Sequence, residues 1–183
     1  MAGNPALPVM LSLDDFLRPG SPLWWLFVSM LAIARGLDLL STYIATPNLK
    51  LEGNPVARWL GWRGGLATNL VLVLLFATWP LLAISLTTTS LLVAAGNLQS
   101  AWIMRSLGEI RYRLWMSERL AEAPRGLPLV CFWGEAVLFG CVGLGLMLFS
   151  GERLVPFGVG LGVCGYGVAV ALFTSLALWR ATH

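Results

Sequence analysis

The dominant feature of the chain is a series of long apolar runs separated by short polar segments. An α-helix needs about 20 predominantly apolar residues to cross the hydrocarbon of a bilayer. The pattern therefore predicts an all-α polytopic membrane helix bundle, which forms a single integral membrane domain over residues 1–183. Its five transmembrane helices are expected at about 22–46, 66–85, 90–104, 128–150 and 155–179.

The run at 66–104 is too long for a single membrane crossing. One helix of that length would reach about 58 Å, roughly twice the hydrocarbon thickness. We therefore place a break at Leu86–Ser90, where three successive threonines can satisfy backbone groups in a tight turn. Pro80 is expected to kink the first of the two resulting spans, or to mark its approach to the interface.

The 12 basic residues are divided unevenly between the two ends of the predicted bundle. Arg18 and Arg153 lie at one end, and Arg35 lies inside the first span. The others all lie at the opposite end: Lys50, Arg58, Arg63, Arg105, Arg111, Arg113, Arg119, Arg125 and Arg180. Because cytoplasmic loops are rich in Lys and Arg, this bias predicts an outer N-terminus and a cytoplasmic C-terminus in a plasma (inner) membrane.

Three polar segments carry helix signals of their own. Ser12–Leu17 predicts a short capped helix on the outer surface, with a solvated or interfacial turn as the alternative. Asn54 followed by a proline predicts the start of a short amphipathic helix that places two tryptophans at the interface. Arg105–Arg125 is expected to continue the third span as a cytoplasmic amphipathic extension whose arginines meet lipid headgroups.

The composition agrees with a membrane protein, since 57% of the residues are hydrophobic, only 11% are charged and the mean hydropathy is +0.77. A soluble domain carries about 25% charged residues. The three cysteines form no C-x-x-C pair and the one histidine is His183, which argues against a disulfide framework, cysteine-ligated zinc and histidine-based metalloprotease chemistry. A net charge of +3 does not indicate nucleic acid, so the lipid bilayer is the expected partner.

Three ionisable residues, Arg35, Asp38 and Glu135, lie inside predicted spans. Each costs about 2.5–3.5 kcal/mol at the centre of a membrane helix, so each needs a partner or a function. Arg35 and Asp38 are three residues apart and can partly neutralise each other. Asp38, Ser41 and Thr42 share one stripe of the first helix, in its cytoplasmic half.

Other polar residues are expected to complete a site around this stripe. If the loop after the first span folds back, Glu52 and Asn54 approach Asp38, at a depth where irregular backbone is tolerated only against protein or a water-filled cavity. Asn97 and Glu135 lie at a comparable depth, which predicts one polar cavity open to the cytoplasm. The candidate binding residues are Arg35, Asp38, Ser41, Thr42, Glu52, Asn54, Asn97 and Glu135.

Two interpretations of these residues remain open. In the structural one they hold the bundle together, through contacts of Asp38 with Arg35, of Asn54 with a helix start, of Glu52 with Lys50 or Arg58, and of Glu135 with Asn97 or Gln99. In the other, Asp38, Glu52 and Asn54 ligate a hard cation such as Mg²⁺, Ca²⁺ or Na⁺, because carboxylate and amide oxygens suit such ions. The neighbouring arginine would then hold the aspartate or meet a phosphate group.

Two of these segments form a recognisable pattern. Asp38–Thr42 reads Asp-x-x-Ser-Thr, and Glu52–Pro55 reads Glu-x-Asn-Pro before the next helix. In them the chain resembles a family of small bacterial multi-pass membrane proteins marked by Asp-x-x-Ser/Thr-Thr and Glu-x-Asn-Pro segments. The resemblance covers roughly residues 31–80. That family has no established activity, so the resemblance implies that these residues form a unit and implies no reaction.

Small residues line one face of each of the last two spans. Such faces let helix backbones approach closely. We expect them to form the seam between spans four and five, with a homodimer seam as the alternative. They are Ala136, Gly140 and Gly143 in span four, and Gly158, Gly162, Gly165 and Ala169 in span five.

Two functions fit these observations. The first is a small binding, accessory or transport subunit whose polar site fixes the bundle or holds an ion or lipid. The second is an intramembrane or interfacial enzyme that acts on a lipid phosphate through a carboxylate-bound divalent cation. The motifs of lipid phosphotransferases and prenyltransferases are absent from the sequence, which favours the first.

Overall fold

The computed structural model describes residues 11–124 and 126–182, with side chains as far as residue 176. This part of the chain folds into helices and connecting turns, which confirms the predicted all-α class. Its helices are α1 (Pro22–Ala45), α2 (Pro55–Phe76), α3 (Pro80–Leu107), α4 (Glu109–Glu122), α5 (Leu127–Leu148) and α6 (Leu154–Thr182). All except α4 are long and apolar enough to span a membrane, over Leu154–Leu176 in the case of α6.

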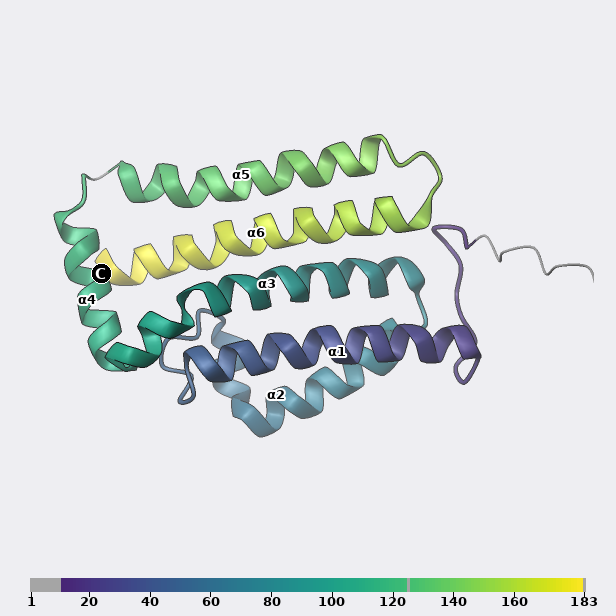
Figure 1. The fold of residues 1–183 in the computed structure, drawn as a ribbon, viewed down its shortest axis with the longest axis horizontal. Helices are drawn as coiled ribbons and strands as arrows, with labels where there is room; N and C mark the ends of the chain where they lie inside the picture. Colours follow the sequence, from purple (N-terminus) through teal and green to yellow (C-terminus); the bar gives the residue numbers. More distant parts are fainter. Residues whose placement is uncertain (1–10, 125, 183) are drawn as a thin grey trace, which may run out of the picture.

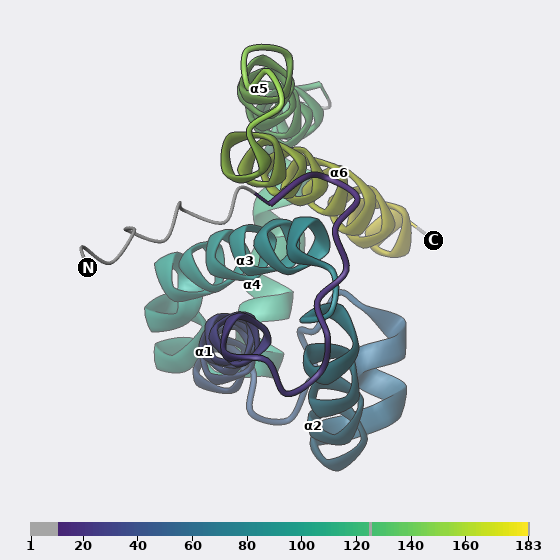
Figure 2. The same cartoon turned by 90° about the vertical axis from the view of Figure 1, so that its right-hand side faces the viewer.

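Four of the helices lie side by side in the order α5, α6, α3 and α1 (Figure 1). The close pairs are α5 with α6, α3 with α6, and α1 with α3. In contrast, α2 lies beside α1 and α3 and makes few contacts with either (Figure 2). One end of the bundle, called here the α4 end, comprises residues 46–54, α4 and the last turns of α6, while the α2–α3 and α5–α6 turns lie at the opposite end (Figure 1).

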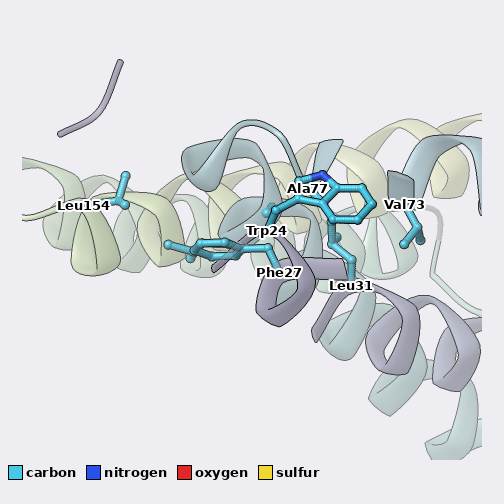
Figure 3. Close-up of a cluster of buried hydrophobic side chains, with 8 residues drawn as sticks. Trp24, Phe27, Leu31, Val73, Ala77 and Leu154 are labelled. Atoms are coloured by element: carbon cyan, nitrogen blue, oxygen red, sulfur yellow. The ribbon is translucent and has the colours of Figure 1, made fainter. Parts of the chain in front are cut away.

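The apolar core lies toward the end opposite α4. It brings together the first turns of α1 with the end of α2 and the beginnings of α3 and α6 (Figure 3). Its buried members are Trp24, Phe27, Leu31, Val73, Ala77, Ala83, Ile84 and Leu154. Val73 is the only residue of α2 that is fully buried, so α2 is held firmly near its C-terminus and weakly elsewhere.

The break between the second and third spans lies nine residues before the predicted one, at 77–79 instead of 86–90. Pro80 has no N–H group and starts α3, and it holds the preceding Trp79 in an extended conformation (φ −119°, ψ 100°). Thr88 and Thr89 are helical because their hydroxyls donate to carbonyls one turn back, Ile84 at 3.0 Å and Ser85 at 3.0 Å. The prediction was wrong because these threonines satisfy their hydroxyls without leaving the helix.

The predicted short helix at Ser12–Leu17 is a turn, which was the stated alternative. The Ser12 N–H donates to the Asp15 carboxylate at 2.6 Å, a local bond that replaces a helical one. The Leu17 N–H donates to the carbonyl of Thr78 at 2.8 Å, and the Trp79 indole donates to the carbonyl of Leu13 at 3.2 Å. The segment is therefore held against the α2–α3 turn by backbone groups that a helix would have used internally.

The predicted amphipathic extension exists, but it does not continue the third span. Gly108 ends α3 with φ 78° and ψ 154°, a conformation open mainly to glycine, and α4 then sets off across the end of the bundle. Its apolar side chains include Ile110 and Leu114, both exposed. Arg125, the predicted end of the extension, lies outside the described residues.

The glycine face of α6 packs mainly against α3, which corrects the predicted seam with α5. A Cβ at Gly162 would lie 2.5 Å from the carbonyl oxygen of Ser85, and the Thr89 hydroxyl donates to the carbonyl of Gly162 at 2.8 Å. Other α6 glycines, Gly160 and Gly167, pack against the small-residue face predicted for α5. Helix α6 thus carries small residues on two faces, one against α3 and one against α5, and on the α3 side Ser85 and Thr89 also donate to its carbonyls.

We expect Gly162→Ala to destabilise the bundle by about 1–3 kcal/mol, because the added methyl meets the backbone of α3. The matched control is Gly145→Ala in α5, where a Cβ meets no other atom of the described residues within 4 Å. The control gains helix propensity and should unfold at the same or a higher temperature. Thermal unfolding in detergent distinguishes the two, and equal melting temperatures would contradict the proposed α3–α6 contact.

Candidate functional site

A cavity of about 820 Å³ lies in the half of the bundle toward the α4 end. Its walls come from α1, α2, α3, α5 and α6 and from the loop at 46–54. Every predicted site residue except the buried Ser41 lines this cavity. Its polar lining comprises Arg35, Asp38, Thr42, Thr46, Glu52, Asn54, Trp62, Thr68, Asn69, Asn97, Gln99, Ser100, Glu135, Tyr166 and Thr174.

Arg35 connects three helices in the wall of this cavity. Its Nη1 group donates to Oδ2 of Asp38 at 2.8 Å within α1 and to the hydroxyl of Ser90 on α3 at 3.1 Å. Its Nε group donates to Oδ1 of Asn69 on α2 at 2.6 Å. The predicted Arg35–Asp38 pair is present, whereas Asn69 and Ser90 were missed. Asn69 is the one amide in the apolar run 66–76, and this could have marked it in the sequence as a residue that needs a partner.

Asn97 joins α3 to α1 through the predicted polar stripe. Its amide donates to the hydroxyl of Ser41 at 3.2 Å and to that of Thr42 at 3.1 Å. The Ser41 hydroxyl donates in turn to the carbonyl of Asp38 at 2.8 Å. The structural interpretation expected polar residues to bond the helices to one another, and these contacts do so. They fix the side of the cavity between α1 and α3.

Glu135 pairs with Tyr166, a residue that the sequence analysis did not single out. The phenol donates to Oε1 of the carboxylate at 3.2 Å, from α6 to α5. The predicted partners of Glu135 were Asn97 and Gln99, but the amide of Asn97 is engaged with α1. The tip of Tyr166 lies against α3 at Gly96, where a Cβ would come within 3.2 Å of the phenol oxygen.

The loop at 46–54 forms the floor of the cavity. Asn54 caps α2 as predicted, its Oδ1 accepting from the N–H groups of Val56 at 2.9 Å and Ala57 at 3.4 Å. Glu52 accepts from the N–H of Asn54 at 2.9 Å, and the described residues show no ion pair of Glu52 with Lys50 or Arg58.

This local bonding bears on the hard-cation hypothesis. The oxygen of Asn54 is occupied by two backbone groups, and Oδ2 of Asp38 is held by Arg35. Glu52 and Asp38 line the same cavity. Of the three proposed ligands, the two carboxylates therefore retain an oxygen for a ligand more readily than the amide does.

Glu109 at the start of α4 is a second residue that the sequence analysis missed. It is buried, and its Oε1 accepts from the hydroxyl of Thr46 at 2.9 Å and from the N–H of Asn48 at 2.8 Å. Nearby, Arg113 donates to the carbonyl of Lys50. Helix α4 therefore holds the loop that closes the cavity, an arrangement that hydropathy alone does not reveal because Glu109 lies in a charged segment.

The α2 helix is kinked near its start. Gly61 departs from helical geometry (φ 61°, ψ −172°), so residues 55–60 form a separate turn before the span proper. Trp62 follows this kink, stacks edge-on against Tyr43 with centroids 5.4 Å apart, and donates its indole N–H to the carbonyl of Pro47 at 2.8 Å. A short helical segment therefore follows Asn54 as predicted, and Trp62, just beyond the kink, attaches α2 to α1 and to the loop.

Comparison with protein-family models, with characterised proteins and with solved structures finds no match to this chain.

We expect Arg35→Gln to destabilise the protein, because it leaves the Asp38 carboxylate without its cation; the pair is partly buried, so the loss should fall below the value of about 3–5 kcal/mol for a fully buried pair. Adding Asp38→Asn should recover part of the loss. The control is Arg119→Gln, whose pair with Glu122 is over half exposed and should matter by less than about 1 kcal/mol. The stability of the unmodified protein, the single variant, the double variant and the control is measured by unfolding in detergent. No recovery of stability in the double variant would contradict the pairing.

We expect Glu109→Ala to release the loop at 46–54, because the Thr46 hydroxyl and the Asn48 N–H lose their acceptor. Backbone hydrogen exchange of that loop should become faster, with little change in the core opposite. Glu118→Ala on the exposed side of α4 is the matched control. Unchanged exchange in the loop of the first variant would show that Glu109 does not hold it.

Proposed function

We propose that the protein binds a small solute in the cavity at the α4 end and serves as a binding, accessory or transport subunit of the membrane. The observation that carries the proposal is the cavity, which is about 820 Å³ in volume and has walls from five helices. Cavities for small molecules commonly measure about 300–1,000 Å³ and combine apolar walls with a few polar groups. The apolar walls here include Phe132, Val170 and Phe173, beside the polar residues described above.

The distribution of packing supports this function. The apolar core fastens the helices together at the opposite end, whereas α2 makes few contacts along the cavity. A helix held at one end and weakly packed at the other can move to admit a solute without unfolding the bundle. The kink at Gly61 separates the moving part from the loop that closes the floor.

The enzyme alternative draws less support from the same geometry. A lipid phosphate would need free cationic or N–H donors, and the Nε and Nη1 groups of Arg35 are engaged by Asp38, Asn69 and Ser90. The amide oxygen of Asn54, one of the proposed metal ligands, is committed to capping α2. A hard cation remains a candidate ligand through the two carboxylates alone.

We infer that the α4 end faces the cytoplasm of a plasma (inner) membrane and that the N-terminus lies outside. Because no basic residue lies between Arg63 and Arg105, moving the second break to 77–79 leaves the predicted division of basic residues between the two ends unchanged. Three of them, Lys50, Arg105 and Arg111, surround a smaller cavity of about 410 Å³ at that end, where anionic headgroups would meet them. The side chain of Arg180 lies outside the described residues.

The test uses three probes of similar shape and different charge: tetraphenylphosphonium, triphenylphosphine oxide and tetraphenylborate. We expect at least one to bind the purified protein saturably in equilibrium dialysis, after subtraction of binding to detergent alone. Ala169→Phe should weaken that binding by about tenfold or more, because Ala169 lines the cavity and a phenyl ring would fill it.

The control, Ala95→Phe, adds the same ring on an exposed face of α3, away from the cavity, and should leave binding unchanged. The proposed function is overturned if none of the three probes binds saturably, or if the two variants bind equally well.

A further inference from the structure

We propose that the solute is an organic cation: an amine, a quaternary ammonium or a similar ion that carries apolar substituents. The inference rests on the proposed function and names the chemical class of its ligand. Three observations support it: the charge of the cavity wall, the hydrogen bonds that already engage several of its donors, and its aromatic lining.

The charges that line the cavity are unequal. Asp38, Glu52 and Glu135 contribute three carboxylates, and Arg35 is the only basic residue among the lining residues of the described chain. Arg35 and Asp38 neutralise each other at 2.8 Å. Two acids remain, one from the loop and one from α5, and each gives one oxygen to a local donor while the other oxygen is available to a ligand.

Several donors of the cavity are already engaged, which disfavours an anionic solute. Arg35 gives its Nε and Nη1 groups to three neighbours, and the amide of Asn97 is bonded to two hydroxyls of α1. The first N–H groups of α2, which would otherwise attract an anion, are capped by Asn54. Among the described lining residues, Nη2 of Arg35 and the amide of Gln99 make no hydrogen bond. To reach the other donors named here, an anion would have to break existing bonds in an apolar medium, where unpaired polar groups are costly.

Aromatic rings complete the surroundings that an organic cation requires. Trp62, Phe132, Tyr166 and Phe173 line the cavity. The faces of such rings attract cations that have lost part of their hydration. The loop reaches α6 here, since a Cβ at Gly53 would lie 3.6 Å from that of Phe173, so the aromatic wall adjoins the loop that carries Glu52.

The size of the cavity favours an organic ion over a bare metal ion. A Ca²⁺ ion needs six to eight oxygens at about 2.3–2.6 Å, and Mg²⁺ needs closer ones. The cavity of about 820 Å³ is lined by apolar groups as well as by oxygens. A bulky cation can contact the rings with its substituents while its charge lies near a carboxylate.

The three probes defined above also test this inference on the unmodified protein. Tetraphenylphosphonium should bind at least about tenfold more tightly than neutral triphenylphosphine oxide, and tetraphenylborate more weakly than either. Glu135→Gln and Glu52→Gln should each weaken binding of the phosphonium by about tenfold and should not weaken binding of the oxide, which carries no charge. The matched control is Glu118→Gln, an exposed acid of α4 outside the cavity, which should change neither.

The possible results separate the two proposals. If the oxide or the borate binds saturably and at least as tightly as the phosphonium, the cationic solute is overturned and the binding function stands. If no probe binds, both are overturned. If a variant does not fold, the order of affinity of the three probes for the unmodified protein still tests the inference. If Mg²⁺ or Ca²⁺ displaces the phosphonium stoichiometrically, the ligand is a hard cation and the organic cation is overturned.

Discussion

The positive charge of Arg35 must be neutralised inside an apolar bundle, and the arrangement of the cavity depends on how this is done. A guanidinium at this depth is tolerated only among partners. Asp38 supplies the opposite charge, while Asn69 and Ser90 supply oxygens from two other helices. Together with the contacts of Trp62, the arginine thereby connects α2 to the rest of the bundle at the α4 end, where apolar packing of α2 is weak.

The two halves of the molecule are stabilised by different forces. Close packing of aromatic and aliphatic side chains holds the end opposite α4, in which Trp24, Phe27 and Leu31 are buried. Hydrogen bonds and one ion pair hold the other half around an open volume. Directional bonds between helices keep polar groups in fixed positions without filling the space between them, which close packing cannot do. This division explains how a bundle of this size can enclose a cavity.

Hydropathy predicted the five apolar helices because it measures the property that membrane helices share, but it located one break wrongly. Within an apolar run the deciding feature was Pro80, which lacks an N–H, while threonines remained helical by bonding to their own backbone. The energetic cost of intramembrane charge identified Arg35, Asp38 and Glu135, all of which line the cavity. Which residue of another helix becomes a partner, such as Tyr166 for Glu135, depends on how each helix is rotated about its axis. Periodicity does not fix that rotation when small residues occupy two faces, as they do in α6.

The bond between Glu109 and the loop has a consequence for how the membrane itself could act on the protein. Helix α4 carries basic and exposed apolar side chains at the end of the bundle (Figure 1), and its first residue accepts from the backbone of the loop that forms the floor of the cavity. Any change in surface charge or lateral pressure that shifts α4 is transmitted to that floor through one carboxylate. The lipid composition of the leaflet at the α4 end would thus regulate entry to the cavity, with no second ligand required.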